Sequence, residues 1–303
     1  MESKQSLDWR WSYFTTDIEL TNFCSQNCLF CPREKMARPS GFIELELLKK
    51  ILLQLAAINS RVTFCGMGTP LLHPKFPEIM EFCRQLKGFN FGLTIQAPAL
   101  DPEGLKLLEI SRPGFIEISF PTIDSELFSR IYPGCDLETS LENVLKLFDL
   151  DPPLRGINII AIRTARENFS DDEIRSFWQE RGFNCRITKC HSRGGNLNAE
   201  EVVAANSRSI KRCGLFAAHS FITWQGKVLA CCHDLDGNSE IADLNKHSIQ
   251  FAGEQKLEII NNAMPFSMCK SCDEPAAERR LPQDPYPLKP KARRKIMATY
   301  AQY

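Results

Sequence analysis

Three cysteines near the start of the chain have a spacing that suits metal binding. They are Cys24, Cys28 and Cys31, and they follow directly after a short apolar run that is typical of a strand. Three thiolates are one ligand short of closing a structural zinc site, and one short of the four cysteines that usually hold a [4Fe–4S] cluster. Such a cluster keeps one iron open for another ligand. The alternative is three buried cysteines on one helical face, which the preceding strand and Pro32 disfavour.

Four further cysteines in the last third of the chain form a second candidate metal site. Cys213 and Cys231 flank Gly226, and Cys269 and Cys272 make a C-x2-C pair. Four soft ligands can fill either a zinc site or one four-iron cluster, and unligated cysteines are the remaining alternative. The adjacent Cys232 has three possible roles: it replaces Cys231 as a ligand, it faces the active site as a hydrogen-atom or proton donor, or it only packs.

The composition favours metal or redox chemistry in a globular protein. The chain has 303 residues, enough for one large domain or two, and 43% of them are hydrophobic. Lys+Arg equals Asp+Glu at 37 each, so no overall charge attracts nucleic acid or an anionic membrane. The first residues lack the apolar core of a signal peptide, and no apolar run reaches the ~18 residues of a membrane span. Thirteen cysteines in such a chain favour metal ligation over disulfides. We therefore expect a cytoplasmic location.

Short apolar runs alternate with helical patterns through the first two-thirds of the chain. Strands are predicted at 17–21, 61–65, 90–95, 115–120, 157–162 and 184–188, and helices at 44–57, 76–86, 102–110, 141–148 and 171–181. Repeated strand–helix units predict an α/β fold with parallel strands, and six of them form an open sheet or a partial barrel. Ligands in such sheets bind at the carboxyl ends of the strands.

The pattern changes after about Gly195. Apolar runs at 221–224 and 227–230 predict a tight hairpin, and a helix is predicted at 248–261. Basic and proline residues dominate the tail beyond Glu274. We therefore expect three parts, a barrel over 1–200, a small hairpin-plus-helix domain over 201–275, and an exposed basic, Pro-rich tail over 276–303.

The C-x3-C-x2-C spacing after the first strand resembles the signature of the radical S-adenosylmethionine (radical SAM) superfamily. The resemblance implies a partial (β/α)6 barrel in which the three cysteines hold a SAM-binding [4Fe–4S] cluster that generates a 5′-deoxyadenosyl radical. The run from Cys65 through Gly66, Gly68 and Thr69 stands where the family has a Gly-rich segment against the methionine amino group. Thr69 replaces the acidic residue common there. Further contacts to SAM are implied for Ser119, Arg163 and the loop at Gly194.

The second cysteine group resembles the auxiliary-cluster extension called the twitch domain, a half-sized relative of the SPASM domain. The resemblance implies a second, auxiliary [4Fe–4S] cluster on Cys213, Cys231, Cys269 and Cys272, with no iron left open for substrate. No cysteine follows Cys272, so one auxiliary cluster is expected. An external electron donor such as flavodoxin or ferredoxin is implied as well.

The substrate follows less directly from the resemblance. Many auxiliary-cluster enzymes modify peptides, and Cys31-Pro32-Arg33 together with the run 38–42 looks like theirs. The leading hypothesis is therefore modification of a ribosomally synthesised precursor peptide, in particular tyrosine-directed backbone splicing with loss of tyramine. The first strand begins too early to leave room for a recognition domain, so a separate leader-recognition protein is expected.

Two other classes of function remain open. One is a dehydrogenase or epimerase that acts on a small molecule such as a sugar or aminocyclitol, because the four-cysteine arrangement also resembles that of aminocyclitol dehydrogenases. The other is a non-catalytic iron–sulfur or zinc protein. The basic segment 279–295 is a further candidate for binding a peptide leader or its recognition subunit, because such leaders are commonly acidic.

Overall fold

The computed structural model describes residues 8–150, 154, 156–197, 213–262, 265–270 and 272–274. Its strands form one sheet in the order β6-β5-β4-β3-β2-β1-β7-β8-β9. Each neighbouring pair from β6 to β7 is parallel, and β8 and β9 are antiparallel to their neighbours. The strands are β1 Thr15–Ile18, β2 Arg61–Phe64, β3 Asn90–Gln96, β4 Ile116–Ser119, β5 Ile157–Arg163, β6 Asn184–Lys189, β7 His219–Ile222, β8 Lys227–Leu229 and β9 Glu240–Asp243.

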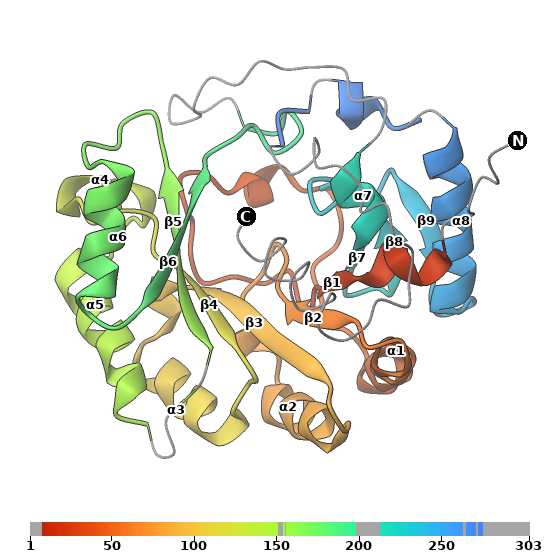
Figure 1. Ribbon diagram of the computed structural model, residues 1–303, viewed down its shortest axis with the longest axis horizontal. Helices are drawn as coiled ribbons and strands as arrows, with labels where there is room; N and C mark the ends of the chain where they lie inside the picture. Colours follow the sequence, from red (N-terminus) through yellow and green to blue (C-terminus); the bar gives the residue numbers. More distant parts are fainter. Residues whose placement is uncertain are drawn as a thin grey trace, which may run out of the picture.

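The helices cover the outer side of this curved sheet. They are α1 Leu45–Ala57, α2 Phe76–Gln85, α3 Pro102–Ser111, α4 Ser125–Ile131, α5 Leu137–Leu145, α6 Asp171–Gln179, α7 Gly214–Ala218 and α8 Ile249–Asn261. Figure 1 shows the strands curving around the centre of the molecule, with α1, α2 and α3 outside β1 to β4. The sheet ends in two edges, β6 and β9, and does not close. The predicted α/β partial barrel is therefore confirmed.

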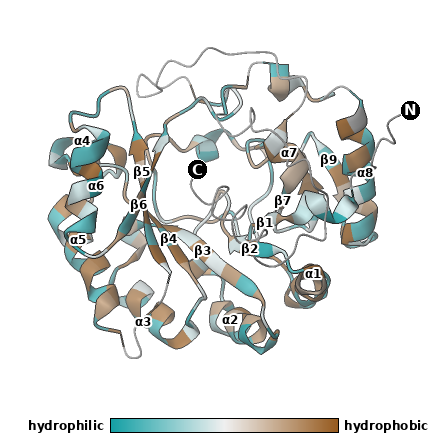
Figure 2. Cartoon of the chain, viewed as in Figure 1, coloured by the Kyte–Doolittle hydropathy of each residue, from teal (hydrophilic) through white to brown (hydrophobic). Residues whose placement is uncertain are grey.

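Local sequence explains where the helices begin and which side of them is buried. Asp101, Asp124, Asp136 and Ser170 cap α3, α4, α5 and α6, each accepting a backbone N–H bond in the first turn. Five apolar residues of α1 share one face at helical spacing and are all buried: Leu45, Leu48, Ile51, Leu52 and Leu55. Figure 2 shows the matching hydrophobic residues along β4 and β5. Burial of these apolar faces between the helices and the sheet holds the strands, and therefore their carboxyl ends, in place.

Three features differ from the prediction. Helix α4 was not predicted, because seven residues are too few to show a clear apolar period. Helix α5 begins at Leu137 rather than 141, since Asp136 supplies the cap. Strand β1 ends at Ile18 because Thr21 pairs with Phe42 instead of continuing the strand.

The predicted hairpin is present, but it belongs to the barrel sheet. Strand β7 pairs in parallel with β1, with Thr15 opposite His219 and Ile18 opposite Ile222. Strand β8 follows through a turn closed by a hydrogen bond from the Gly226 N–H to the Thr223 carbonyl, 2.8 Å. A hairpin sequence shows its own two strands, but not the distant strand beside which it lies. The C-terminal cysteines are thereby fixed relative to β1.

Two predictions, the domain boundaries and the basic tail, stay predictions. The boundaries near residues 200 and 275 and the basic segment 279–295 lie outside the described residues. All thirteen cysteines are free of disulfides. Within the described ranges, none of the helices combines the length and apolar character that crossing a bilayer demands.

Candidate active site

The loop between β1 and α1 places the first cysteine beside the carboxyl ends of the neighbouring strands. Thr69 Oγ1, just after β2, lies 3.1 Å from Cys24 Sγ. Gln96, the last residue of β3, donates from Nε2 to Cys24 Sγ at 3.4 Å and to Thr69 Oγ1 at 2.6 Å. Cys24 therefore lies at the end of a parallel sheet where ligands bind, with hydrogen-bond donors next to its sulfur.

The three cysteines of this loop influence one another's charge. Burial, together with the neighbouring thiolates of Cys31 and Cys24, raises the pKa of the Cys28 thiol to about 12. Gathering three ionised thiols in one place costs free energy unless a metal centre takes up their charge. Three cysteines with a hydrogen-bonded sulfur fit a cluster that keeps one iron open.

The Gly-rich segment after β2 lies directly against the start of the cysteine loop. A Cβ atom at Gly68 would stand 2.4 Å from the carbonyl oxygens of both Thr21 and Phe23. The Thr69 N–H donates to the Phe23 carbonyl at 2.8 Å. Any side chain at Gly68 would displace the backbone that leads into Cys24, so this position requires glycine for close approach.

A buried ion pair fixes the two limbs of the cysteine loop. Arg38 forms two hydrogen bonds with Glu19, at 2.9 and 3.2 Å, and both side chains are almost fully buried. The Arg38 Nε also donates to the Leu235 carbonyl at 2.7 Å, and Glu19 accepts the Met67 N–H at 3.1 Å. The pair therefore joins the loop, the Gly-rich segment and the C-terminal region.

The second cysteine group surrounds a single apolar cavity of about 30 Å³. All four sulfur-bearing residues predicted as ligands line it, together with Phe216 and Met268: Cys213, Cys231, Cys269 and Cys272. Burial, with a smaller contribution from Cys213, raises the pKa of Cys269 and of Cys272 to about 11 each. The four cysteines come from three segments of the last third of the chain, between Cys213 and Cys272, yet they line one cavity.

The adjacent Cys231 and Cys232 have different surroundings. Cys231 lines the cavity, and Cys232 does not. The charge of Cys232 acts on Asp17 and on Cys65, which come from β1 and the end of β2. Burial raises the pKa of the Asp17 carboxyl, while His219, whose Nε2 lies 3.5 Å away, lowers it. Cys232 therefore lies between the two settings: its charge acts on these groups of the barrel strands, and its sulfur also lies within 4.8 Å of the ligand atoms of Cys231 and His233.

Two histidines and an acid connect the loop after β6 to the C-terminal cysteines. Glu274 lies 2.9 Å from His233 Nε2 and 3.1 Å from His191 Nε2. Ser192 donates to Asp273 through both its N–H and its hydroxyl, at 2.7 Å. These contacts hold the Cys272 segment against the loop that contains Gly194.

Comparison with known proteins identifies the family. A family model described as the radical SAM superfamily matches residues 18–170, just over half of the chain, and spans the first cysteine group and the Gly-rich segment. The chain belongs to the radical SAM superfamily. Membership supports S-adenosylmethionine and one [4Fe–4S] cluster as its cofactors.

Two curated members of related sequence are GTP 3′,8-cyclases. One, from Chlorobaculum tepidum, is 28% identical over 38% of this chain and 34% of its own length. A probable one from Methanococcus maripaludis is 22% identical over 48% of this chain and 49% of its own length. The matched part therefore spans between a third and a half of those proteins.

Solved radical SAM structures share the fold. SuiB from Streptococcus suis bound to S-adenosylmethionine has a TM-score of 0.64 at 14% identity, covering 88% of this chain and 72% of SuiB. BtrN in complex with AdoMet and 2-DOIA has a TM-score of 0.57 at 14% identity, covering 88% of this chain and 95% of BtrN. At this identity the likeness shows the fold alone.

The remaining positions predicted to contact SAM have partners within the protein. Ser119, the last residue of β4, accepts hydrogen bonds from the Tyr132 hydroxyl at its carbonyl (3.0 Å) and Oγ (3.2 Å). Arg163, the last residue of β5, donates to Asp171 and to the Phe169 carbonyl at the start of α6. Gly194 has φ +71° and lies against His233, in a loop with left-handed backbone. All three stand at strand ends on the side of the cysteine loop, and their roles towards SAM stay predictions.

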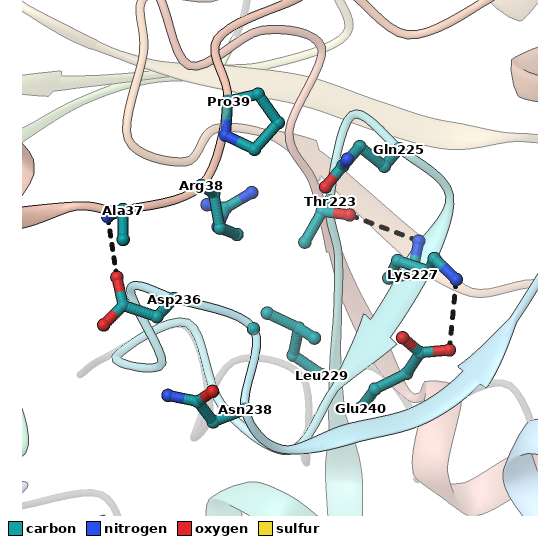
Figure 3. A pocket seen from close by; sticks show the side chains of 11 residues that line it. Ala37, Arg38, Pro39, Thr223, Gln225, Lys227, Leu229, Asp236, Asn238 and Glu240 are labelled. Carbon is teal, nitrogen blue, oxygen red and sulfur yellow. Dashed lines mark hydrogen bonds and ion pairs between the residues drawn. The ribbon is translucent and has the colours of Figure 1, made fainter.

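A surface pocket of about 480 Å³ lies between the end of the cysteine loop and the β8–β9 hairpin. Figure 3 shows Ala37, Arg38 and Pro39 facing Asp236, Asn238 and Glu240 across it. The Ala37 N–H donates to Asp236 at 2.8 Å, and Lys227 pairs with Glu240 at 3.2 Å. No cysteine lines this pocket. Its contacts anchor the cysteine loop to the C-terminal hairpin.

Sequence analysis missed Gln96, Glu19 and Arg38 as site residues. Gln96 had a usable signal, because it directly follows a predicted strand whose carboxyl end faces the site. Arg38 was noted only as part of the run 38–42, and nothing in a local pattern pairs it with Glu19, 19 residues away, or buries both.

Proposed function

We propose that this chain is a two-cluster radical SAM enzyme that modifies a ribosomally synthesised precursor peptide. The observation that carries the two-cluster part is the separation of the cysteines: three in the loop at the strand ends, and four around one small apolar cavity. A non-catalytic metal protein would have no use for the first, incompletely ligated site.

The residues of the first site would bind and orient S-adenosylmethionine. Cys24, Cys28 and Cys31 would hold a [4Fe–4S] cluster, and when bound this cluster and S-adenosylmethionine supply a carbon radical that abstracts hydrogen from substrate. Gly66 lies against the Glu19 side chain and Gly68 against the backbone of the cysteine loop, so that both glycines let the segment after β2 approach that loop closely. Gln96 and Thr69 hydrogen-bond around Cys24 and would keep its sulfur oriented.

The second site fits an auxiliary [4Fe–4S] cluster in a twitch-like unit. Zn–S bonds of about 2.3 Å place the sulfurs of a tetrahedral zinc site about 3.8 Å apart. Among the described residues, the groups of three potential ligands within 4.8 Å of one another do not include three of these four cysteines. This wider arrangement around an apolar cavity favours an iron–sulfur cluster over zinc.

Cys232 is the candidate catalytic side chain at the substrate. Its neighbours Asp17 and Cys65 belong to the barrel strands, where a substrate carbon would meet the radical. A thiol there can return a hydrogen atom or a proton to substrate, and the four cavity cysteines cannot, because all of them would be ligands.

The peptide part of the proposal rests on motif resemblance and on SuiB, whose structure has been solved with its precursor peptide SuiA bound. Arg33 and Arg38 of the peptide-type motif make internal contacts, with the Gln26 carbonyl and with Glu19, and thus order the loop. A separate leader-recognition protein and an electron donor of the flavodoxin or ferredoxin type remain part of the proposal. So does tyrosine-directed splicing within this class.

A small-molecule dehydrogenase is the second candidate. The observation that favours it is that the alignment covers 95% of BtrN, the structure solved with AdoMet and 2-DOIA, against 72% of SuiB.

The test is anaerobic reconstitution followed by product analysis. The proposal predicts about eight irons per chain, S-adenosylmethionine cleavage, and a mass change in a precursor peptide co-expressed with the enzyme. An aminocyclitol and GTP serve as competing substrates. Oxidation of the aminocyclitol with no change in any peptide would favour the second candidate, and four irons plus zinc would remove the auxiliary cluster.

A further inference from the structure

A lysine is fully buried behind the four-cysteine cavity. Lys256 lies on α8, and its side chain has no exposed surface. Its Nζ donates to the His219 carbonyl at 2.5 Å and to Ser220 Oγ at 3.0 Å. The Ser220 hydroxyl donates in turn to the Ser12 carbonyl at 2.7 Å, so its oxygen is free to accept from an ammonium. The pocket around Nζ is therefore built for a positively charged donor.

This ammonium has no carboxylate to balance it in the described part of the chain. The ionisable groups that act on it are the thiols of Cys213 and Cys231. Burial lowers the pKa of Lys256 to about 7 even though the two cysteines oppose this shift. The other deeply buried cation, Arg38, is by contrast paired with Glu19. A buried cation without an anion is costly, so a compensating negative charge is needed nearby.

The four-cysteine cavity is the place where that charge would arise. Phe216 connects the two, because its ring lies 4.8 Å from Nζ and also lines the cavity. Its backbone N–H donates to Cys213 Sγ at 3.4 Å. Four thiolates around a [4Fe–4S] core leave a net negative centre in both common oxidation states, and the charge becomes more negative by one on reduction.

We infer that Lys256 is a charge-compensating residue for the metal centre on Cys213, Cys231, Cys269 and Cys272, and that it raises the reduction potential of that centre. The inference rests on the auxiliary cluster proposed above. A fixed positive charge inside the protein stabilises the reduced form more than the oxidised form, because the reduced form carries the extra electron. Lys256 would thereby make the auxiliary cluster a better acceptor for an electron from substrate.

The experiment compares Lys256→Met, Lys256→Arg and Lys256→Gln in a chain whose first cluster is removed by changing Cys24, Cys28 and Cys31 to alanine. The potential of the remaining cluster is measured by redox titration with electron paramagnetic resonance (EPR). We expect Lys256→Met and Lys256→Gln to lower it by at least about 59 mV, a tenfold change in a one-electron equilibrium constant. Lys256→Arg keeps the positive charge, so its reduction potential should stay close to that of the chain with Lys256. Lys246→Met, at an exposed lysine just before the same helix, is the matched control and should leave the reduction potential unchanged.

Stability measurements separate this role from a purely structural one. An uncompensated buried ammonium destabilises the metal-free protein, so Lys256→Met should melt no lower than the unchanged chain without metal and gain less on cluster loading. A variant that does not fold even without metal, or one with full iron and an unchanged potential, would overturn the inference. If the unchanged C-terminal site binds no iron, the proposed auxiliary cluster fails instead, and the iron count shows this before any lysine is changed.

Discussion

The two cysteine groups use the same ligand in opposite settings. The first lies in a loop over the ends of β1 to β3, where its cysteines are half-buried and Cys24 contacts polar side chains. The cysteines of the second are half-buried too, but they line a small apolar cavity with a cation buried behind it. Three thiols leave room for a further ligand on a metal centre, whereas four thiols can complete the coordination. In the proposed function, the chain thereby separates a site that reacts from one that accepts an electron.

The largest expected effect comes from removing the open site. Changing Cys24, Cys28 and Cys31 together to alanine should reduce the iron content from about eight to about four per chain and abolish 5′-deoxyadenosine formation. Iron assay and chromatography measure both. Cys83→Ala, at a buried cysteine outside both groups, is the control and should keep all the iron. Radical formation by the triple variant would show that the open loop is not the reactive site.

The adjacent cysteines sharpen the boundary between the two settings. Cys231→Ala removes a cavity-lining thiol and should lose most of the auxiliary iron, about four per chain, whereas Cys232→Ala should keep it. Cys232→Ala should instead stop or redirect product formation while S-adenosylmethionine is still cleaved. Loss of iron from the Cys232 variant alone would exchange the roles of the two residues.

The buried ion pair that orders the open loop can be broken on one side. Arg38→Met leaves the Glu19 carboxylate buried without its partner, and should lower the free energy of unfolding by about 3–5 kcal/mol. Urea denaturation of the metal-free protein measures this. Replacing both residues, Glu19→Leu with Arg38→Met, should cost less than Arg38→Met alone. If the single and the double variant lose the same free energy of unfolding, the ion pair itself stabilises the loop, and the cost of the single change does not come from an uncompensated charge.

Substitution of Gly68 is expected to have the smallest effect of these changes. Gly68→Ala puts a Cβ against two carbonyl oxygens at the entry to the loop, and should weaken S-adenosylmethionine binding about tenfold while the auxiliary iron stays. Gly88→Ala is the control: its Cβ would meet nothing within 4 Å, and its φ of +72° costs stability there, but S-adenosylmethionine binding should stay unchanged. Tight binding by the Gly68 variant, measured by equilibrium dialysis, would contradict a close approach at this segment.

Much of the fold follows from local patterns in the sequence. All six barrel strands and five of the surrounding helices lie within a few residues of their predicted positions, because apolar periodicity and capping residues act locally. The cysteines of both candidate sites were chosen from their spacing and from a family resemblance, and their role as metal ligands stays a prediction.

Long-range arrangements were not accessible in this way. The pairing of β7 with β1 joins residues more than 200 positions apart, and the contacts of Arg38 with Leu235 and of Lys256 with His219 depend on it. Lys256 in particular looks like an ordinary polar position of an amphipathic helix until α8 is packed against β7. Such residues become visible only when the whole sheet is assembled.

The central claim, that the open site binds S-adenosylmethionine and the enclosed site does not, is tested most directly by EPR of the two half-loaded proteins. One carries alanine at Cys24, Cys28 and Cys31, and the other carries alanine at Cys269 and Cys272. Adding S-adenosylmethionine should change the spectrum of the reduced cluster only in the second protein, whose open site is intact. A spectral change in the first protein would contradict the account. So would an unchanged spectrum of the second protein, provided that each protein still carries its one remaining cluster.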